Sequence, residues 1–260
     1  MLGAIVGDVI GSPYEHANVK STDFRFFAHG AQCTDDSVLT VATADVLLRG
    51  DVDYARTYQE YFHRFPNAGY GGAFTAWANR RETRPYGSWG NGSAMRVAPV
   101  GWARDTIDDV LDEAERSASV THDHPDGVTG AQAVAACVFL ARTQRDRDRI
   151  RAFVHEGCGY PLDRTIDQIR PTYEFDVSCR GTVPVAVQAF LESTDFESAI
   201  RLAISVGGDS DTIGCIAGAI AHAFYGTIPQ PLLQPVLEIY MSPDLADVSL
   251  TFCERFGVPV

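Results

Sequence analysis

The chain has 260 residues and a net charge of −13, from 21 Lys and Arg residues against 34 Asp and Glu residues. Its contents of hydrophobic residues (45%) and charged residues (21%) are those of a globular protein, which excludes a disordered, collagen-like or coiled-coil chain. So acidic a composition argues against general nucleic-acid binding, which relies on basic patches, and against adhesion to anionic membranes. We expect a single domain over residues 1–260, because a chain of this length buries enough surface to fold without disulfides.

The N-terminus and the cysteines favour a cytoplasmic protein. Residues 1–8 lack a basic segment and Asp8 interrupts their apolar run, so they do not form a signal peptide. No apolar stretch reaches the roughly 18–20 residues of a membrane span. The six cysteines have neither C-x-x-C nor zinc-finger spacing, and we expect free thiols, with three disulfides as the alternative. We also expect a monomer, because the sequence has no long apolar stripe left to expose.

The helical period dominates the hydrophobic pattern. It predicts helices over 38–49, 54–65, 71–81, 94–102, 105–119, 131–142, 147–156, 183–191, 196–206, 212–225 and 232–240. Gly50 ends the first helix, and Thr182 begins the helix 183–191 with Pro184 in its first turn. The helix 131–142 is apolar nearly all round, which places it at the centre of the fold.

Strand signals are weak along the chain. The best alternating stretch is Thr172–Ser178, and it is short. We therefore predict an all-α protein. Long loops, which in folded domains are usually functional or disordered, are expected near 16–33, 82–92, 120–129 and 157–181.

Carboxylates and hydroxyls gather in three segments. They are Gly7-Asp8 with Glu15, Thr34-Asp35-Asp36-Ser37, and Gly207-Gly208-Asp209-Ser210-Asp211-Thr212. Adjacent aspartates repel one another unless a cation compensates, and these oxygens suit Mg²⁺, Mn²⁺ or Ca²⁺. Helix capping is the alternative, because the second and third segments each precede a predicted helix. A cap needs one oxygen and each segment offers several, so both interpretations stay open.

A glycine-rich segment, Gly90-Asn91-Gly92-Ser93-Ala94-Met95-Arg96, opens the helix predicted over 94–102. Backbone N–H groups at a helix N-terminus bind anions, phosphate in particular. The alternative is an ordinary turn in which Ser93 is the N-cap. Few other places in so acidic a chain would accept a phosphate.

Histidines and aromatic residues supply weaker candidates. His122 and His124 stand two residues apart with no third ligand nearby, which favours a hydrogen bond to a ligand, or a cap near Pro125, over zinc. Four aromatic residues are candidates for stacking on a purine ring: Tyr70, Trp77, Tyr86 and Trp89. Their irregular spacing is more typical of anchors in a core or a loop.

Together, five segments resemble the ADP-ribosylglycohydrolase family, and they occur in that family's order. They are GAIVGDVIGSPYE (3–15), TDDS (34–37), GNGSAMR (90–96), THDHP (121–125) and GGDSDTIGCIAGAIAHAFYG (207–226). The resemblance implies a compact orthogonal multi-helix bundle with a central cleft that holds two Mg²⁺ ions. Mn²⁺ is the alternative metal.

The same resemblance implies roles for individual residues. One set of metal ligands is Thr34, Asp35 and Asp36, and the other is Asp209, Asp211 and Thr212. Glu15 matches a glutamate that ligates, gates or assists the chemistry, and His122 matches a residue near the distal ribose. The loop that holds the pyrophosphate is matched by Gly90, Asn91, Gly92, Ser93 and Met95.

The activity implied is Mg²⁺-dependent cleavage of the glycosidic bond between ADP-ribose and a modified group. That group is a protein side chain, a small molecule or a nucleic-acid base, and the reaction releases ADP-ribose and so reverses ADP-ribosylation. A carboxylate of Glu15, Asp36 or Asp209 positions or deprotonates the attacking water, and the sequence does not choose among them. The alternatives are another two-metal nucleotide hydrolase and a non-catalytic protein that binds ADP-ribose or is structural, like some lens crystallins.

Overall fold

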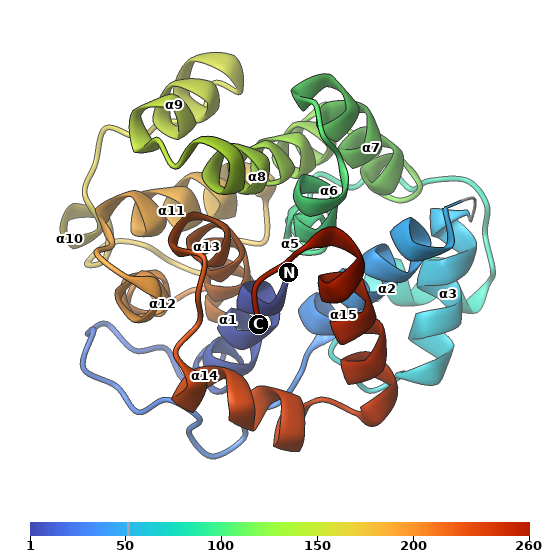
Figure 1. Ribbon diagram of the computed structural model, residues 1–260, viewed down its shortest axis with the longest axis horizontal. Coiled ribbons are helices and arrows are strands. Elements are labelled where there is room, and N and C mark those ends of the chain that lie inside the picture. The colour runs from blue at the N-terminus through green and yellow to red at the C-terminus, as the bar shows by residue number, and fades with distance from the viewer. Residues whose placement is uncertain (51–52) are drawn as a thin grey trace.

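The computed structural model describes residues 1–50 and 53–260, and its regular structure is helical (Figure 1). The α helices are α1 Leu2–Gly11, α2 Asp35–Arg49, α3 Tyr54–Arg64, α4 Gly72–Asn79, α5 Gly92–Met95, α6 Ala98–Ala103, α7 Ile107–Ser119, α8 Pro125–Gln144, α9 Arg147–Ala152, α10 Ile166–Ile169, α11 Cys179–Glu192, α12 Phe196–Ser205, α13 Ser210–Tyr225, α14 Gln230–Pro235 and α15 Pro243–Phe256. A 3₁₀ turn, η1, spans Ser12–Tyr14, and two π-helical turns, η2 and η3, span Phe153–Gly157 and Val236–Tyr240. The all-α class predicted from the sequence is confirmed.

Glycines let α1 lie directly against α13 near the centre of the molecule (Figure 1). They are Gly3, Gly7 and Gly11 of α1 and Gly214 and Gly218 of α13. A Cβ on Gly7 would collide with the carbonyl oxygen of Gly214, and one on Gly11 would lie 2.6 Å from Cα of Asp211. Because no side chain separates the two backbones, Asp8 of α1 and Asp211 of α13 are carried into the same region.

Several predicted helices are confirmed. α2 ends at Gly50, whose φ of 81° needs the conformational freedom of glycine. α8 is buried over most of its length and contacts α5, α6, α7 and α13, as expected of its apolar sequence. α12 and α13 begin and end within two residues of the predicted bounds.

The helix predicted over 183–191 begins earlier than expected. α11 starts at Cys179, because the side chain of Ser178 caps it by accepting a hydrogen bond from the N–H of Gly181 at 2.9 Å. Thr182 is therefore inside the helix, with its hydroxyl donated to the carbonyl of Asp176. Pro184 also lies inside the helix rather than in its first turn, so that prediction is wrong.

The helix predicted over 94–102 is two short helices, α5 and α6. Pro99 has no N–H to donate to the carbonyl of Met95, as a continuous helix would require. That carbonyl instead accepts hydrogen bonds from the hydroxyl of Thr40 and the thiol of Cys215.

Thr172–Ser178 does not form a strand, because its one β contact is an isolated antiparallel bridge between Gly90 and Ser178. The predicted loops at 120–129 and 157–181 contain the start of α8, all of α10 and the first turn of α11. α1 and α15 were not predicted. α1 is buried all round, so it shows no amphipathic period.

All six cysteines are unpaired, as expected. Across residues 1–50 and 53–260, none of the helices combines the length and the hydropathy that crossing a bilayer requires.

Candidate metal centre and substrate cleft

A cavity of about 620 Å³ opens where the C-terminus of α1 and the N-termini of α2, α5 and α13 approach one another. The sequence-predicted residues that line it are Glu15, Thr34, Asp35, Asp36, Gly90, Asn91, Gly92, Met95, His122, Asp209, Asp211 and Thr212. Ser93 does not line it: its hydroxyl donates to the carbonyl of Gly127 at 2.7 Å and ties α5 to α8. Segments up to about two hundred residues apart in the sequence thus meet around one cavity.

Asp8 holds the start of α2 from the side of α1. One of its carboxylate oxygens accepts the hydroxyl of Thr34 at 2.7 Å. The other accepts the backbone N–H groups of Thr34 (3.0 Å) and Ser37 (3.1 Å), together with the Ser37 hydroxyl. Thr34 in turn caps α2 by accepting a hydrogen bond from the N–H of Asp36. The capping interpretation of the second acidic segment is therefore correct in part, and Asp8 supplies much of it.

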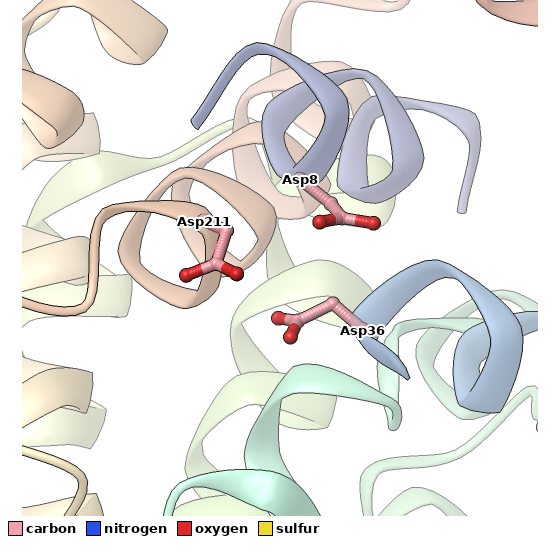
Figure 2. Close-up of side chains that lie close together, drawn as sticks. All are labelled: Asp8, Asp36 and Asp211. Atoms are coloured by element: carbon pink, nitrogen blue, oxygen red, sulfur yellow. The ribbon is translucent and has the colours of Figure 1, made fainter. Parts of the chain in front are cut away.

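Two groups of three carboxylates converge at the floor of the cavity, and all of their members except the fully buried Asp8 line it. Oxygens of Asp8, Asp36 and Asp211 lie within 4.8 Å of one another, and Figure 2 shows the three side chains pointing together from α1, α2 and α13. Oxygens of Glu15, Asp209 and Asp211 form a second such group. Asp211 belongs to both groups, which places it between two candidate cation sites.

The residues fit a divalent cation. Oδ2 of Asp36 accepts a hydrogen bond from the hydroxyl of Thr212 (3.3 Å) and lies 3.4 Å from the hydroxyl of Thr34, whose proton goes to Asp8. The other oxygen of Asp36, Oδ1, is buried with no hydrogen-bond partner among the described residues. A buried carboxylate oxygen without a partner, close to two further carboxylates, is unfavourable unless a positive charge lies beside it. The donors are all hard oxygens, as Mg²⁺ and Mn²⁺ prefer.

Burial and mutual repulsion disfavour the ionised forms of these carboxyl groups. Burial raises the pKa of Asp8 to about 6, although hydrogen bonds from Ser37 and Thr34 oppose the shift. Burial and the nearby charge of Asp8 raise the pKa of Asp35 to about 8 and that of Asp36 well above its usual range. Burial and the charge of Asp36 also raise the pKa of Asp211 well above its usual range.

These shifts predict how stability depends on pH in the absence of metal. A carboxyl group whose pKa is raised on folding keeps a proton that the unfolded chain releases. Its contribution to stability is therefore lost as the pH rises from about 4 to about 8, the window set by Asp8 and Asp35. Mg²⁺ competes with protons for the same oxygens, so it should raise the unfolding temperature more at pH 8 than at pH 5. Thermal unfolding in EDTA and in Mg²⁺ measures both effects, and equal shifts at the two pH values would contradict this assignment.

The glycine-rich segment lines the same cavity as the carboxylates. Asn91 joins the two regions: its side-chain amide donates to Oδ2 of Asp209 at 2.6 Å and to the hydroxyl of Thr182 at 3.0 Å. A Cβ on Gly92 would lie 3.2 Å from Nε2 of His122, so glycine here lets the backbone approach the imidazole. The ring of His122 is held by a 2.7 Å hydrogen bond between Nδ1 and the hydroxyl of Thr121. Burial lowers the pKa of His122, which keeps the ring neutral.

Arg96 is a buried cation that lines the same cavity, and no role for it was predicted from the sequence. Its guanidinium donates to the carbonyl of Ser117 and the hydroxyl of Thr121, and it lies 4.3 Å from the ring centroid of Tyr58. No carboxylate of the described residues forms an ion pair with Arg96. Its positive charge therefore favours anions in this part of the cavity.

Only one of the four proposed stacking residues lines the cavity. Tyr86 does so, with its ring centroid 5.9 Å from that of His122. Tyr70 stacks on Phe74, and Trp77 is buried, so both serve as anchors. Trp89 is half exposed and lies outside the lining, whereas Phe175, which was not proposed, lines the cavity and is 53% exposed.

The model of the ADP-ribosylglycohydrolase family matches residues 1–257. The chain belongs to the ADP-ribosylglycohydrolase family. Human ADP-ribosylhydrolase ARH3 is 28% identical to this ADP-ribosylglycohydrolase family member, with coverage of 96% of this chain and 91% of that protein. ADP-ribosylarginine hydrolase Tri1 of Pseudomonas putida is 29% identical, with coverage of 89% and 71%.

A solved structure described as an ADP-ribosylglycohydrolase-related protein complex has the same fold. Its TM-score against this chain is 0.70 at 23% sequence identity, and the match covers 97% of this chain and 96% of that one. Membership of the ADP-ribosylglycohydrolase family makes the protein a glycosyl hydrolase.

Proposed function

We propose that this enzyme hydrolyses the glycosidic bond between ADP-ribose and a modified group, that it requires Mg²⁺, and that it releases free ADP-ribose. The observation that carries the proposal is the convergence of the two carboxylate groups, which share Asp211, at the floor of a cavity of about 620 Å³. A structural or purely binding protein would gain nothing from so unfavourable an arrangement of buried charges. The names of the relatives, ADP-ribosylhydrolase and ADP-ribosylarginine hydrolase, support the same activity.

The cavity has two electrostatically different ends that suit such a substrate. The backbone of Gly90–Met95 and the buried Arg96 favour the diphosphate, and Tyr86 and His122 offer ring faces beside it. The carboxylates at the other end favour the ribose hydroxyls and the positive charge that develops on the ribose during bond cleavage. The scissile bond then lies over the carboxylates.

We propose that Thr34, Asp35 and Asp36 hold one cation and that Asp209, Asp211 and Thr212 hold a second, with Asp211 also facing the first. When bound, Mg²⁺ supplies Lewis-acid stabilisation and neutralises the carboxylates. Asp8 helps to form the first site by fixing Thr34 and the start of α2. A metal ion would also relieve the unpartnered oxygen of Asp36.

Among Glu15, Asp36 and Asp209, we favour Glu15 as the group that takes the proton of the attacking water. Asp209 accepts a short hydrogen bond from Asn91, and Asp36 accepts one from the hydroxyl of Thr212. The carboxylate of Glu15 is half-buried and accepts no hydrogen bond from the described residues. It forms an ion pair with the exposed His16 at 3.6 Å and lies within 4.8 Å of oxygens of Asp209 and Asp211. Burial and the nearby Asp209 raise the pKa of Glu15, but the pKa values of Asp36 and Asp209 are raised too, so the choice rests on the absence of hydrogen bonds to the Glu15 carboxylate.

Further proposals concern the domain organisation, the oligomeric state and the cellular compartment of the enzyme. We propose that residues 1–260 work as a single domain and as a monomer in the cytoplasm. The six unpaired cysteines fit a reducing compartment.

The test is to identify the product and its dependence on metal. We expect the protein to release ADP-ribose, identified by its mass, from at least one of a panel of ADP-ribosylated arginine, serine, cysteine and nucleic-acid substrates. EDTA should stop the release and added Mg²⁺ should restore it. Release of AMP or phosphate would instead indicate a nucleotide phosphate hydrolase. Undiminished activity in EDTA would contradict the metal requirement.

A further inference from the structure

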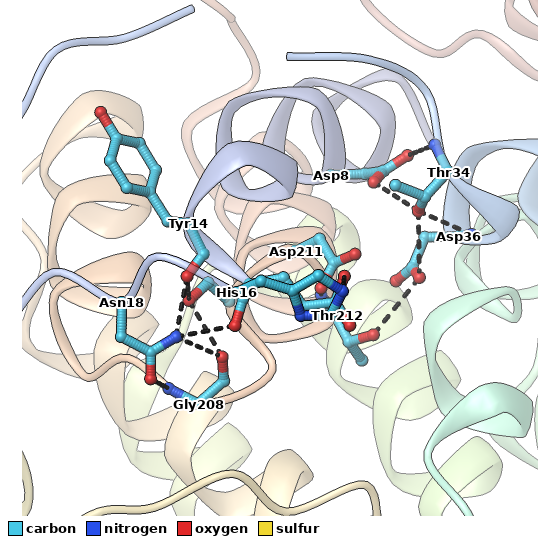
Figure 3. A network of polar contacts seen from close by, with 11 residues as sticks. Asp8, Tyr14, His16, Asn18, Thr34, Asp36, Gly208, Asp211 and Thr212 are labelled. Carbon is cyan, nitrogen blue, oxygen red and sulfur yellow. Dashed lines mark hydrogen bonds and ion pairs between the residues drawn. The ribbon is translucent and has the colours of Figure 1, made fainter. Parts of the chain in front are cut away.

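The side chain of Asn18 connects two segments that carry carboxylates of the site. Its Oδ1 accepts a hydrogen bond from the N–H of Gly208 at 2.8 Å. Its Nδ2 lies within donor distance of three carbonyls, those of Tyr14 (2.8 Å), Glu15 (2.8 Å) and Gly208 (3.1 Å). Figure 3 shows these contacts, which join the segment after α1 to the turn before α13. Asn18 therefore holds the backbone of Glu15 next to the residue that precedes Asp209.

Lys20 makes a second connection of the same kind. Its ammonium group donates to the carbonyls of Val206 (2.5 Å) and Tyr173 (2.7 Å). Val206 is the C-cap of α12, where a positive charge is favourable. A Cβ on Gly207 would lie 3.1 Å from Oδ1 of Asn18, so the turn and the loop over 16–33 fit closely.

Such connections are needed because the carboxylates repel one another. Oxygens of Glu15, Asp209 and Asp211 lie within 4.8 Å of one another. Glu15 follows the short turn η1 and precedes the loop over 16–33, so no long helix holds it in place. Without a tether, repulsion would move Glu15 outward, whereas Asp209 and Asp211 are fixed at the start of α13.

We propose that Asn18 is a positioning residue that locks the backbone of Glu15 against the Gly207–Gly208 turn and so fixes the distance from Glu15 to Asp209 and Asp211. The inference rests on the proposed function in one respect, the role of this carboxylate group in metal binding and catalysis. The hydrogen bonds themselves are independent of it. Asn18 lies at the surface, so replacing it opens no cavity in the core.

Two variants separate positioning from space filling. In Asn18→Asp the shape is retained, but a carboxylate oxygen replaces the NH₂ group that faces three carbonyls, so the contact becomes repulsive. In Asn18→Ala the hydrogen bonds are lost and no repulsion is introduced. Positioning therefore predicts that Asn18→Asp is the more damaging change, whereas a space-filling role predicts that Asn18→Ala is. Asn79→Asp, at an exposed position in α4, is the matched control for the added charge.

The first measurement is Mg²⁺ binding by calorimetry without substrate. We expect affinity to fall about tenfold in Asn18→Ala and further in Asn18→Asp, the range typical of residues that orient metal ligands, with no change in Asn79→Asp. The amide proton of Gly208 should exchange faster in Asn18→Ala, because its acceptor is lost. The unfolding temperature in EDTA should stay close to that of the unaltered protein. Unchanged Mg²⁺ affinity in both Asn18 variants would overturn the proposal, as would greater damage from alanine than from aspartate.

The second measurement is turnover, which separates this proposal from the proposed function. We expect kcat to fall by about the same factor as metal affinity, while KM changes little, because Asn18 lies away from the diphosphate end. An equal loss expressed only in KM would overturn the positioning role. If the unaltered protein released no ADP-ribose and yet the Asn18 variants bound Mg²⁺ more weakly, the proposed function would fail and the positioning role would stand.

Discussion

Asp211→Asn is expected to reduce turnover by about 10³-fold or more, because the substitution removes the one carboxylate that belongs to both groups at the cavity floor. Asparagine keeps the shape of the side chain but removes the charge that two cations would share. Saturating Mg²⁺ should not restore turnover, because both carboxylate groups lose a member. The measurement is release of ADP-ribose together with Mg²⁺ binding by calorimetry.

The same variant should be more stable than the unaltered protein in EDTA. Burial and the charge of Asp36 disfavour ionised Asp211 in the metal-free protein, and asparagine avoids both costs. Mg²⁺ should then raise the unfolding temperature of Asp211→Asn less than that of the unaltered protein. Asp247→Asn, on an exposed part of α15, is the matched control and should change neither quantity. Full turnover in Asp211→Asn would refute the two-cation assignment.

Gly7→Ala is expected to destabilise the protein by about 3 kcal/mol. In an isolated helix the same change would stabilise by up to about 1 kcal/mol, so packing decides the sign. The new methyl group would collide with the backbone of Gly214, a neighbour that cannot move aside as a flexible side chain can. The free energy of unfolding from urea titration measures the effect.

The control for Gly7→Ala is Gly157→Ala. A Cβ at Gly157 meets only one ring atom of Phe153, at 4.0 Å, and the position is exposed. Its free energy of unfolding should change by less than about 0.5 kcal/mol. Because α1 carries Asp8, displacement of α1 from α13 in Gly7→Ala should also weaken Mg²⁺ binding. A Gly7→Ala protein of unchanged stability would show that the contact between α1 and α13 yields easily.

Local features of the site were predictable from the sequence. Thr34 caps α2 through the N–H of a residue only two positions away, which is a property of the sequence itself. The helical period and Gly50 similarly predicted a helix here and its C-terminal end. Two helix bounds were predicted wrongly for local reasons: the cap at Ser178 starts α11 before Pro184, and Pro99 lacks the N–H that would continue α5.

Asp8 and Asn18 illustrate what local patterns leave open. Asp8 stands in a helix with no amphipathic period, and its partners Thr34 and Ser37 come 26 and 29 residues later. Asn18 is a residue type common in any loop, and its hydrogen-bond partner Gly208 is 190 residues away. Ser93 belongs to the predicted loop, but the rotation of α5 turns its hydroxyl to Gly127 instead of the cavity.

The sequence by itself determined the helical class, the hard-oxygen chemistry of the acidic segments and the resemblance to one family, because each depends on residue type and on spacing within a segment. Only the tertiary structure decided which carboxylates share a site. That choice follows from the glycine contact between α1 and α13, which brings Asp8 to Asp211 across 203 positions of the chain. Close packing of two backbones is a pairwise property, so neither helix alone reveals it.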